Sequence, residues 1–206
     1  MTGRERLLTA LRGKTPDVVP VTWELVGRFA NALTGRHDWK AMVDAHREMG
    51  SAVFNLQGVG PHLAVDLPEG YEDCAKGEEQ ADGSYLTTGT LTTPRGQLTG
   101  RRISNFVQGD PLVPKTIDYL VKKREDYDVF EDYVVHAARG AHPNTAQSEE
   151  ARAYVGEDGL VGFWMGDSLY HVAHSRRDTE YILDLMEIPA RMHRVFEAVD
   201  QLKEKE

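Results

Sequence analysis

The residues best suited to chemistry lie just after short apolar segments of the chain. Glu24 follows the apolar segment 18–23, and Arg28 lies four residues further on. Residues four apart share one face of a helix, so this carboxylate and this guanidinium can pair with each other or contact a ligand together. We predict that Glu24 and Arg28 bind substrate; the alternative is a surface ion pair, which contributes little to stability.

A second group follows the apolar segment 160–165. Asp167, Tyr170 and His171 lie at the start of an expected helix. An imidazole exchanges protons near neutral pH, so His171 is a candidate general acid or base. We predict that Asp167 and His171 are catalytic and that Tyr170 binds substrate. The alternatives are that Asp167 only caps the helix and that His171 is a packed helical residue.

Two further polar residues come from the middle of the chain. Asn55 lies near the end of the apolar segment 51–56 and needs a hydrogen-bond partner there, either a ligand or the backbone. His62 lies in the Gly- and Pro-rich loop that follows. We predict that both bind substrate. No metal site is predicted, because the single cysteine, Cys74, cannot form a zinc-binding cluster.

The elements that would position these residues alternate between helices and strands. Thr2 and Glu5 have the spacing of a capping box, and Gly13 is suited to end the helix that they begin. The remaining elements expected in the first third are a strand at 18–23, helices at 24–34 and 38–49, and a strand at 51–56. Apolar strands that alternate with helices predict an α/β fold with a parallel sheet.

The middle of the chain predicts a different arrangement. Turn signals at Asp82-Gly83 and Pro94-Arg95-Gly96 separate Thr-rich segments, which is typical of an antiparallel hairpin or meander over about 71–107. The elements expected after it are helices at 116–123, 125–138 and 145–155, a strand at 160–165, and helices that begin near Ser168, Asp178 and Pro189.

Four stretches of the chain resemble one known family. "TGRERLLTALRGKTPDVVPV" is similar to the start of the uroporphyrinogen decarboxylase superfamily, and "YLTTGTLTTPRGQLTGR" is similar to its inserted hairpin. "VPKTIDYLVKKREDYDVFEDYV" and "LVGFWMGDSLYHVAHSRRDTEYILDLMEIPARMHRVFEAV" resemble later segments. The resemblance implies a single domain at 1–206 that is the N-terminal part of a (β/α)8 TIM barrel, with the hairpin inserted.

One position departs from the decarboxylases of that superfamily. They carry Arg-Gln-Ala-Gly-Arg-Tyr after the first strand, where the arginines hold substrate carboxylates; here Glu24 replaces the first arginine and Arg28 matches the second. The resemblance therefore implies the cobalamin-dependent methyltransferase branch, with one-carbon transfer between a small methylated compound and a corrinoid carrier. Two alternatives stay open: tetrapyrrole decarboxylation by a lyase, and a truncated, non-catalytic binding or partner subunit.

Length and charge limit the partners. A full barrel needs about 250 residues, so we expect a small-molecule substrate together with a corrinoid protein, a polypeptide that supplies the rest of the barrel, or self-association. No cofactor is expected on this chain alone, and a corrinoid would be substrate or carrier. The net charge of −9 argues against nucleic-acid binding. With neither a signal peptide nor a membrane-spanning run in the sequence, a cytoplasmic protein is expected.

Overall fold

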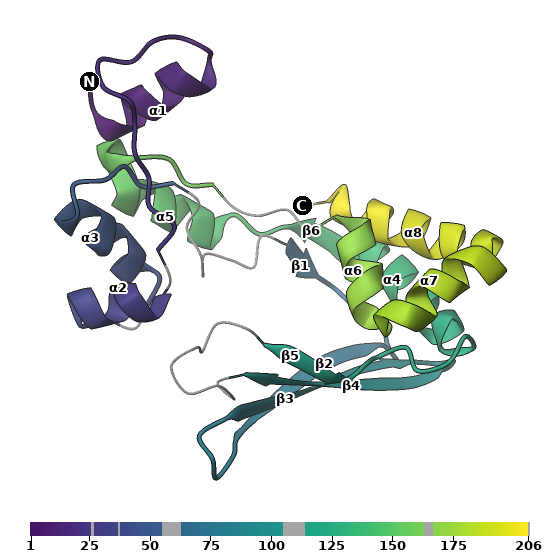
Figure 1. Cartoon of the computed structure of the whole chain (residues 1–206). Helices are drawn as coiled ribbons and strands as arrows, with labels where there is room; N and C mark the ends of the chain where they lie inside the picture. The colour runs from purple at the N-terminus through teal and green to yellow at the C-terminus, as the bar shows by residue number, and fades with distance from the viewer. Residues whose placement is uncertain (26, 37, 55–62, 105–113, 163–166, 206) are drawn as a thin grey trace. The chain divides into compact units, whose positions relative to one another are not determined.

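A computed structural model describes residues 1–25, 27–36, 38–54, 63–104, 114–162 and 167–205. The chain divides into two compact units (Figure 1). Unit 1 comprises Met1–Ala64 and Pro143–Met165, and unit 2 comprises Val65–His142 and Gly166–Glu206. The single domain at 1–206 stays a prediction.

Unit 1 is mostly helical. Its elements are α1 (Gly3–Leu11), α2 (Gly27–Thr34), α3 (Lys40–Glu48), α5 (Ala146–Val155) and the short 3-10 helix η1 (Gly156–Asp158). The helices predicted over 24–34, 38–49 and 145–155 are thus confirmed with slightly shorter bounds. Their buried residues form one core: Leu25, Ala30, Ala41, Met42, Val43, Ala45, Val53, Ala151 and Val155.

The start of α1 follows the sequence signal closely. The Thr2 hydroxyl accepts a hydrogen bond from the Glu5 backbone N–H at 3.1 Å, and the Glu5 carboxylate accepts one from the Thr2 backbone N–H at 2.8 Å. This reciprocal pair is the predicted capping box, and it satisfies two N–H groups that a helix start leaves without partners. Gly13 follows the helix with a φ of +68°, a conformation that favours glycine.

The three segments predicted as parallel strands lie side by side without forming a regular sheet among the described residues. The Ala52 N–H donates to the Val21 carbonyl at 2.9 Å, and the Leu160 N–H donates to the Val53 carbonyl at 2.9 Å. Val53 and Gly159 form a parallel bridge. A Cβ on Gly159 would lie 2.0 Å from the Val53 carbonyl oxygen, so only glycine allows this approach.

The predicted strand at 18–23 is wrong as a regular strand. Pro20 has no N–H to donate, and only one backbone hydrogen bond, at Val21, ties the segment to its neighbour in the described part of unit 1. The segments at 51–56 and 160–165 contribute single bridges or bonds, and residues 55–56 and 163–165 lie outside the described ranges.

Unit 2 is built on an antiparallel sheet. Its strands β2 (Glu72–Glu79), β3 (Tyr85–Thr93), β4 (Gly96–Ser104) and β5 (Lys115–Asp118) lie in that order. The predicted meander is therefore confirmed and extends to β5. The helix predicted at 116–123 is wrong, because its first residues pair with β4: Thr116 lies opposite Arg102 and Asp118 opposite Arg101.

Four helices complete unit 2. They are α4 (Asp126–Gly140), α6 (Ser168–Ser175), α7 (Asp178–Glu187) and α8 (Pro189–Lys203). The helix predicted at 125–138 and those predicted to begin near Ser168, Asp178 and Pro189 are therefore confirmed. Helix α4 packs against both β3 and α8 (Figure 1). Leu91 and Leu98, which are paired across β3 and β4, join Tyr127, Phe130 and Val134 of α4 in the core. A second sheet pairs β1 (Leu63–Val65) with β6 (Ala141–Pro143).

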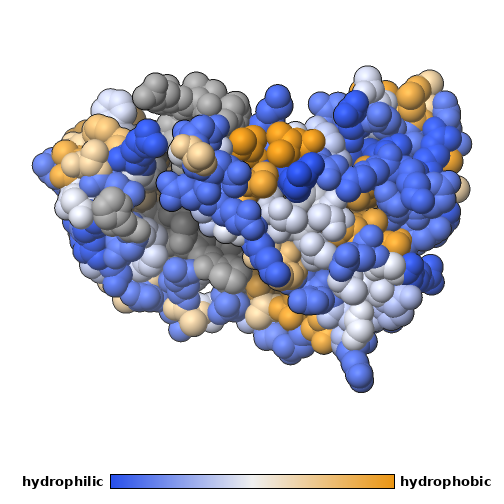
Figure 2. All heavy atoms as spheres, turned by 90° about the horizontal axis from the view of Figure 1, so that it is seen from below, coloured by the Kyte–Doolittle hydropathy of each residue, from blue (hydrophilic) through white to orange (hydrophobic). Residues whose placement is uncertain are grey.

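The described elements make a mixed α/β protein, and they do not close into a barrel. The predicted α/β class is confirmed at this coarse level. Hydrophilic residues dominate the face drawn in Figure 2, with hydrophobic residues gathered in small separate patches. None of the helices in the described ranges is both long and apolar enough to cross a lipid bilayer.

Candidate functional site

Glu24 and Arg28 lie at the exposed end of the first apolar segment of unit 1. Leu25 anchors this end in the core, while the side chains of Trp23, Glu24 and Arg28 are exposed. Within the described residues, Glu24 and Arg28 form no ion pair with each other, so the surface pair weighed as an alternative is not formed. Both side chains are exposed, but Glu24 precedes α2, which begins at Gly27, so the prediction that the two residues share a helix face is wrong.

The opposite end of the same segments holds a cavity. It has a volume of about 460 Å³, and its lining includes Val18, Val19, Gly50, Arg6 and Asp158. Close by, the Arg6 guanidinium donates two hydrogen bonds to Asp17 and holds the pKa of that carboxyl well below its usual range.

Asn55 and His62, the other predicted substrate-binding residues of the N-terminal half, lie outside the described residues. Their predicted roles stay predictions.

The group on α6 belongs to unit 2. The Asp167 carboxylate accepts a hydrogen bond from the Tyr170 backbone N–H at 2.6 Å, which is the capping role weighed for it from the sequence. The Tyr170 ring stacks on His174 with centroids 3.8 Å apart and stays exposed. His171 is exposed and lines a cavity of unit 2. The catalytic roles of Asp167 and His171 and the binding role of Tyr170 stay predictions.

The cavity that His171 lines is largely apolar. Its volume is about 340 Å³, and it lies between β3 and the helices α4, α6 and α8. Its apolar walls are Val65, Leu91, Leu120, Phe130, Val134, Ala137, Val199 and Leu202. Its polar side chains are Asp73, Thr90, Tyr133 and His171. A concave apolar pocket with a few polar groups is the usual form of a small-molecule site.

Asp73 and Tyr133 were not singled out by the sequence. The Tyr133 hydroxyl donates to Asp73 Oδ2 at 2.9 Å. Burial of the ring and the adjacent Asp73 charge raise the pKa of Tyr133, so the hydroxyl keeps its proton at neutral pH. The sequence alone holds no signal for this contact, because it depends on the register of β2 and on the packing of α4.

A second polar cluster in unit 2 also escaped the sequence reasoning. The Tyr71 hydroxyl lies 3.0 Å from Asp132 Oδ2 and 3.3 Å from His136 Nε2. Burial and the Asp132 hydrogen bond raise the pKa of Tyr71. Arg95 lies 3.4 Å from the other Asp132 oxygen. The signal available was the spacing of Asp132 and His136, which puts both on one face of α4.

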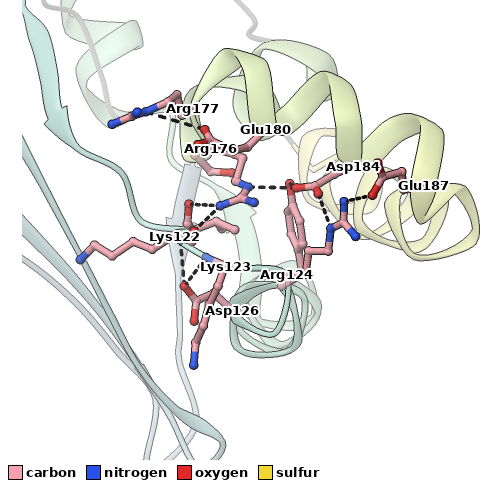
Figure 3. Close-up of polar contacts among 12 residues, drawn as sticks. Lys122, Lys123, Arg124, Asp126, Arg176, Arg177, Glu180, Asp184 and Glu187 are labelled. Atoms are coloured by element: carbon pink, nitrogen blue, oxygen red, sulfur yellow. Dashed lines mark hydrogen bonds and ion pairs between the residues drawn. The ribbon is translucent and has the colours of Figure 1, made fainter.

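The buried ion network in Figure 3 serves structure. Asp184 is 1% exposed and accepts hydrogen bonds from Arg124 Nε at 2.8 Å and Arg176 Nε at 2.9 Å. Arg176 also donates to the backbone carbonyl of Lys122. These contacts tie α7 to the end of α6 and to the segment just before α4. The charged groups are paired with one another.

No three His, Cys, Asp or Glu side chains are grouped to hold a metal ion in the part of the chain that the structure describes. The prediction of no metal site stays a prediction.

Comparison of the chain with protein-family models, with curated proteins and with solved structures finds no match. The functional argument therefore depends on the side chains themselves.

Proposed function

We propose that the chain is the N-terminal part of a (β/α)8 barrel of the uroporphyrinogen decarboxylase superfamily, in its methyltransferase-like branch. In this proposal it takes part in methyl transfer between a small methylated compound and a corrinoid carrier. The observation that supports it is the position of Glu24. This residue is exposed and follows the segment 18–23, which lies beside the segment at Ala52 and Val53, and that segment in turn lies beside Gly159 and Leu160.

The order of these segments is that of the first strands of such a barrel. Val21 bonds to Ala52, and Val53 in turn bridges to Gly159, so the middle segment joins the other two. Helices α2 and α3 lie between the first two segments in the chain, as βα units require. Ligands of a barrel bind at the ends of strands where Glu24 lies.

The charge of Glu24 favours methyl transfer over decarboxylation of a porphyrinogen. A carboxylate at this end repels a substrate that carries several carboxylates, and it accepts hydrogen bonds from a neutral or cationic ligand. Arg28 is exposed in the first turn of α2 and is available for a single anionic group. The arrangement favours a methylated compound or a corrinoid over a porphyrinogen. His171 and Asp167 are proposed to handle protons, and Tyr170, Asn55 and His62 to contact substrate.

A partner is part of this proposal. Val18, Val19 and Val21 are exposed although they belong to an apolar segment, with Val19 at 76%. Apolar side chains gathered on one exposed segment favour contact with a further polypeptide. We propose that a second copy of the chain, a corrinoid protein or the rest of a barrel covers them. A non-catalytic partner subunit would use the same surface.

The test is a titration of methylcobalamin against the wild-type chain and two variants. Glu24→Ala is expected to weaken binding at least about tenfold, because it removes the proposed acceptor. Glu48→Ala is the matched control: Glu48 is an exposed carboxylate of unit 1, at the end of α3 that precedes the 51–56 segment. Equal effects of the two substitutions, or measurable decarboxylation of uroporphyrinogen, would contradict the proposal.

A further inference from the structure

The largely apolar cavity of unit 2 has an exposed carboxylate, that of Asp73, at its edge. Asp73 lies on β2 directly opposite Leu91, on the face of the sheet that α4 covers. It accepts a hydrogen bond from the Tyr133 hydroxyl at 2.9 Å, and no Lys, Arg or His among the described residues forms an ion pair with it. The second Asp73 oxygen can accept a hydrogen bond from a ligand or from water.

The other walls of the cavity suit an apolar, positively charged group. Phe130 and Tyr133 present aromatic rings, whose faces attract cations, and Leu91, Val134 and Val199 are buried apolar side chains. No Lys or Arg lines the cavity. A volume of about 340 Å³ is at the lower end of the range for small-molecule sites, which run from about 300 to 1,000 Å³.

We propose that this cavity binds a small organic ammonium ion, with its apolar substituents against the aliphatic and aromatic walls and its charge beside Asp73. An anion would be repelled by the carboxylate, and a neutral molecule of the same shape would gain no charge interaction with it. A single carboxylate offers too few oxygens for a divalent metal. His171, to which the proposed function gives a proton-transfer role, lines the same cavity. The test below measures ligand binding alone, so its outcome does not depend on any methyl-transfer activity.

The test uses a pair of ligands with the same shape and different charge. Choline carries a trimethylammonium group, and 3,3-dimethyl-1-butanol replaces it with a neutral tert-butyl group. Calorimetric titrations of both ligands are made in the same buffer at pH 8. The intact chain is expected to bind choline at least about tenfold more tightly than the alcohol, a difference typical of a partly desolvated cation on aromatic and carboxylate groups.

Two substitutions of equal chemical type locate the site. Asp73→Asn removes the charge and keeps the shape and a hydrogen-bond acceptor for Tyr133, so it should abolish the preference for choline over the alcohol. Glu72→Gln makes the same change one residue earlier, where the alternation of the strand places the side chain on the opposite face of the sheet. It should leave both affinities unchanged.

A third variant removes space without changing charge. Ala137 is buried and lines the cavity, so Ala137→Leu should weaken both ligands. Circular dichroism checks that each variant folds, and Asp73→Ser, which also removes the charge, replaces Asp73→Asn if the latter does not. No choline binding up to about 10 mM, equal binding of the two ligands, or an unchanged preference in the folded Asp73 variant would overturn the proposal.

Discussion

Asp184 shows how unit 2 tolerates a buried charge. Its carboxylate is 1% exposed, and Arg124, Arg176 and the Tyr127 hydroxyl all donate to it. Burial and this negative charge raise the pKa of Tyr127, which therefore stays a hydrogen-bond donor. The network is favourable only while every member is present, because each cation would otherwise be desolvated without compensation.

Substitutions on the two acidic partners of Arg124 should therefore differ in effect. Asp184→Asn leaves the buried Arg176 without its counter-ion and should lower the free energy of unfolding by roughly 3 kcal/mol. Glu187→Gln removes an exposed partner of Arg124 and should change it by less than about 1 kcal/mol. Urea denaturation followed by circular dichroism measures both. Similar losses for the two variants would show that the network does not hold α7 in place.

Local sequence was enough for some side chains and not for others. The cap at Asp167 and the capping box of Thr2 depend on residues three apart, so spacing alone predicts them. The contact of Tyr133 with Asp73 joins residues 60 apart, and it follows from the register of β2 and the packing of α4. Neither is visible in a single sequence. Asp73 and Tyr133 were missed for this reason.

Helices were predicted better than strands. Helices α4, α5, α7 and α8 have clear apolar periodicity and start signals, such as Pro189 at the first position of α8. The segment 18–23 has the composition of a strand, but a strand needs a paired neighbour, and Pro20 cannot donate to one. Residues 116–118 belong to the helix predicted at 116–123, yet pairing with β4 prevails over local propensity there.

Helix α1 supplies a test of docking. Leu7 is 7% exposed and Leu11 is 66% exposed, although residues four apart lie on the same face of a helix. Leu7→Ala should lower the free energy of unfolding by about 2–3 kcal/mol through lost burial and the cavity left behind. Leu11→Ala should change it by no more than about 0.5 kcal/mol. If both variants unfold at the wild-type urea concentration, α1 is not docked on unit 1.

The chain as a whole presents an apolar segment that its described residues do not cover. Val18, Val19 and Val21 are exposed beside a set of segments in barrel order. Resemblance to a family predicted the order of these segments, and the predicted parallel strands appear only as isolated bonds. A regular strand needs a ladder of backbone hydrogen bonds to a neighbour, and in the described part of the chain the segment 18–23 has one such bond.

Self-association is the expected consequence for the purified chain. Sedimentation at micromolar concentrations should show dimers or larger species, because burial of the exposed valines is favourable. Val19→Asp should shift the chain toward monomer. Leu169→Asp, on an exposed apolar residue of unit 2, is the control and should not. A wild-type chain that stays monomeric over the whole concentration range would show that this segment needs no partner.

The ligand preference set by Glu24 is the central claim, and an equilibrium titration with two ligands tests it most directly. Methylcobalamin and uroporphyrinogen are titrated separately against the wild-type chain and against Glu24→Arg. The wild-type chain should bind methylcobalamin and not uroporphyrinogen, and the charge reversal should shift the ratio of affinities at least about tenfold toward uroporphyrinogen. Binding of uroporphyrinogen by the wild-type chain, or an unchanged ratio in Glu24→Arg, would contradict the account.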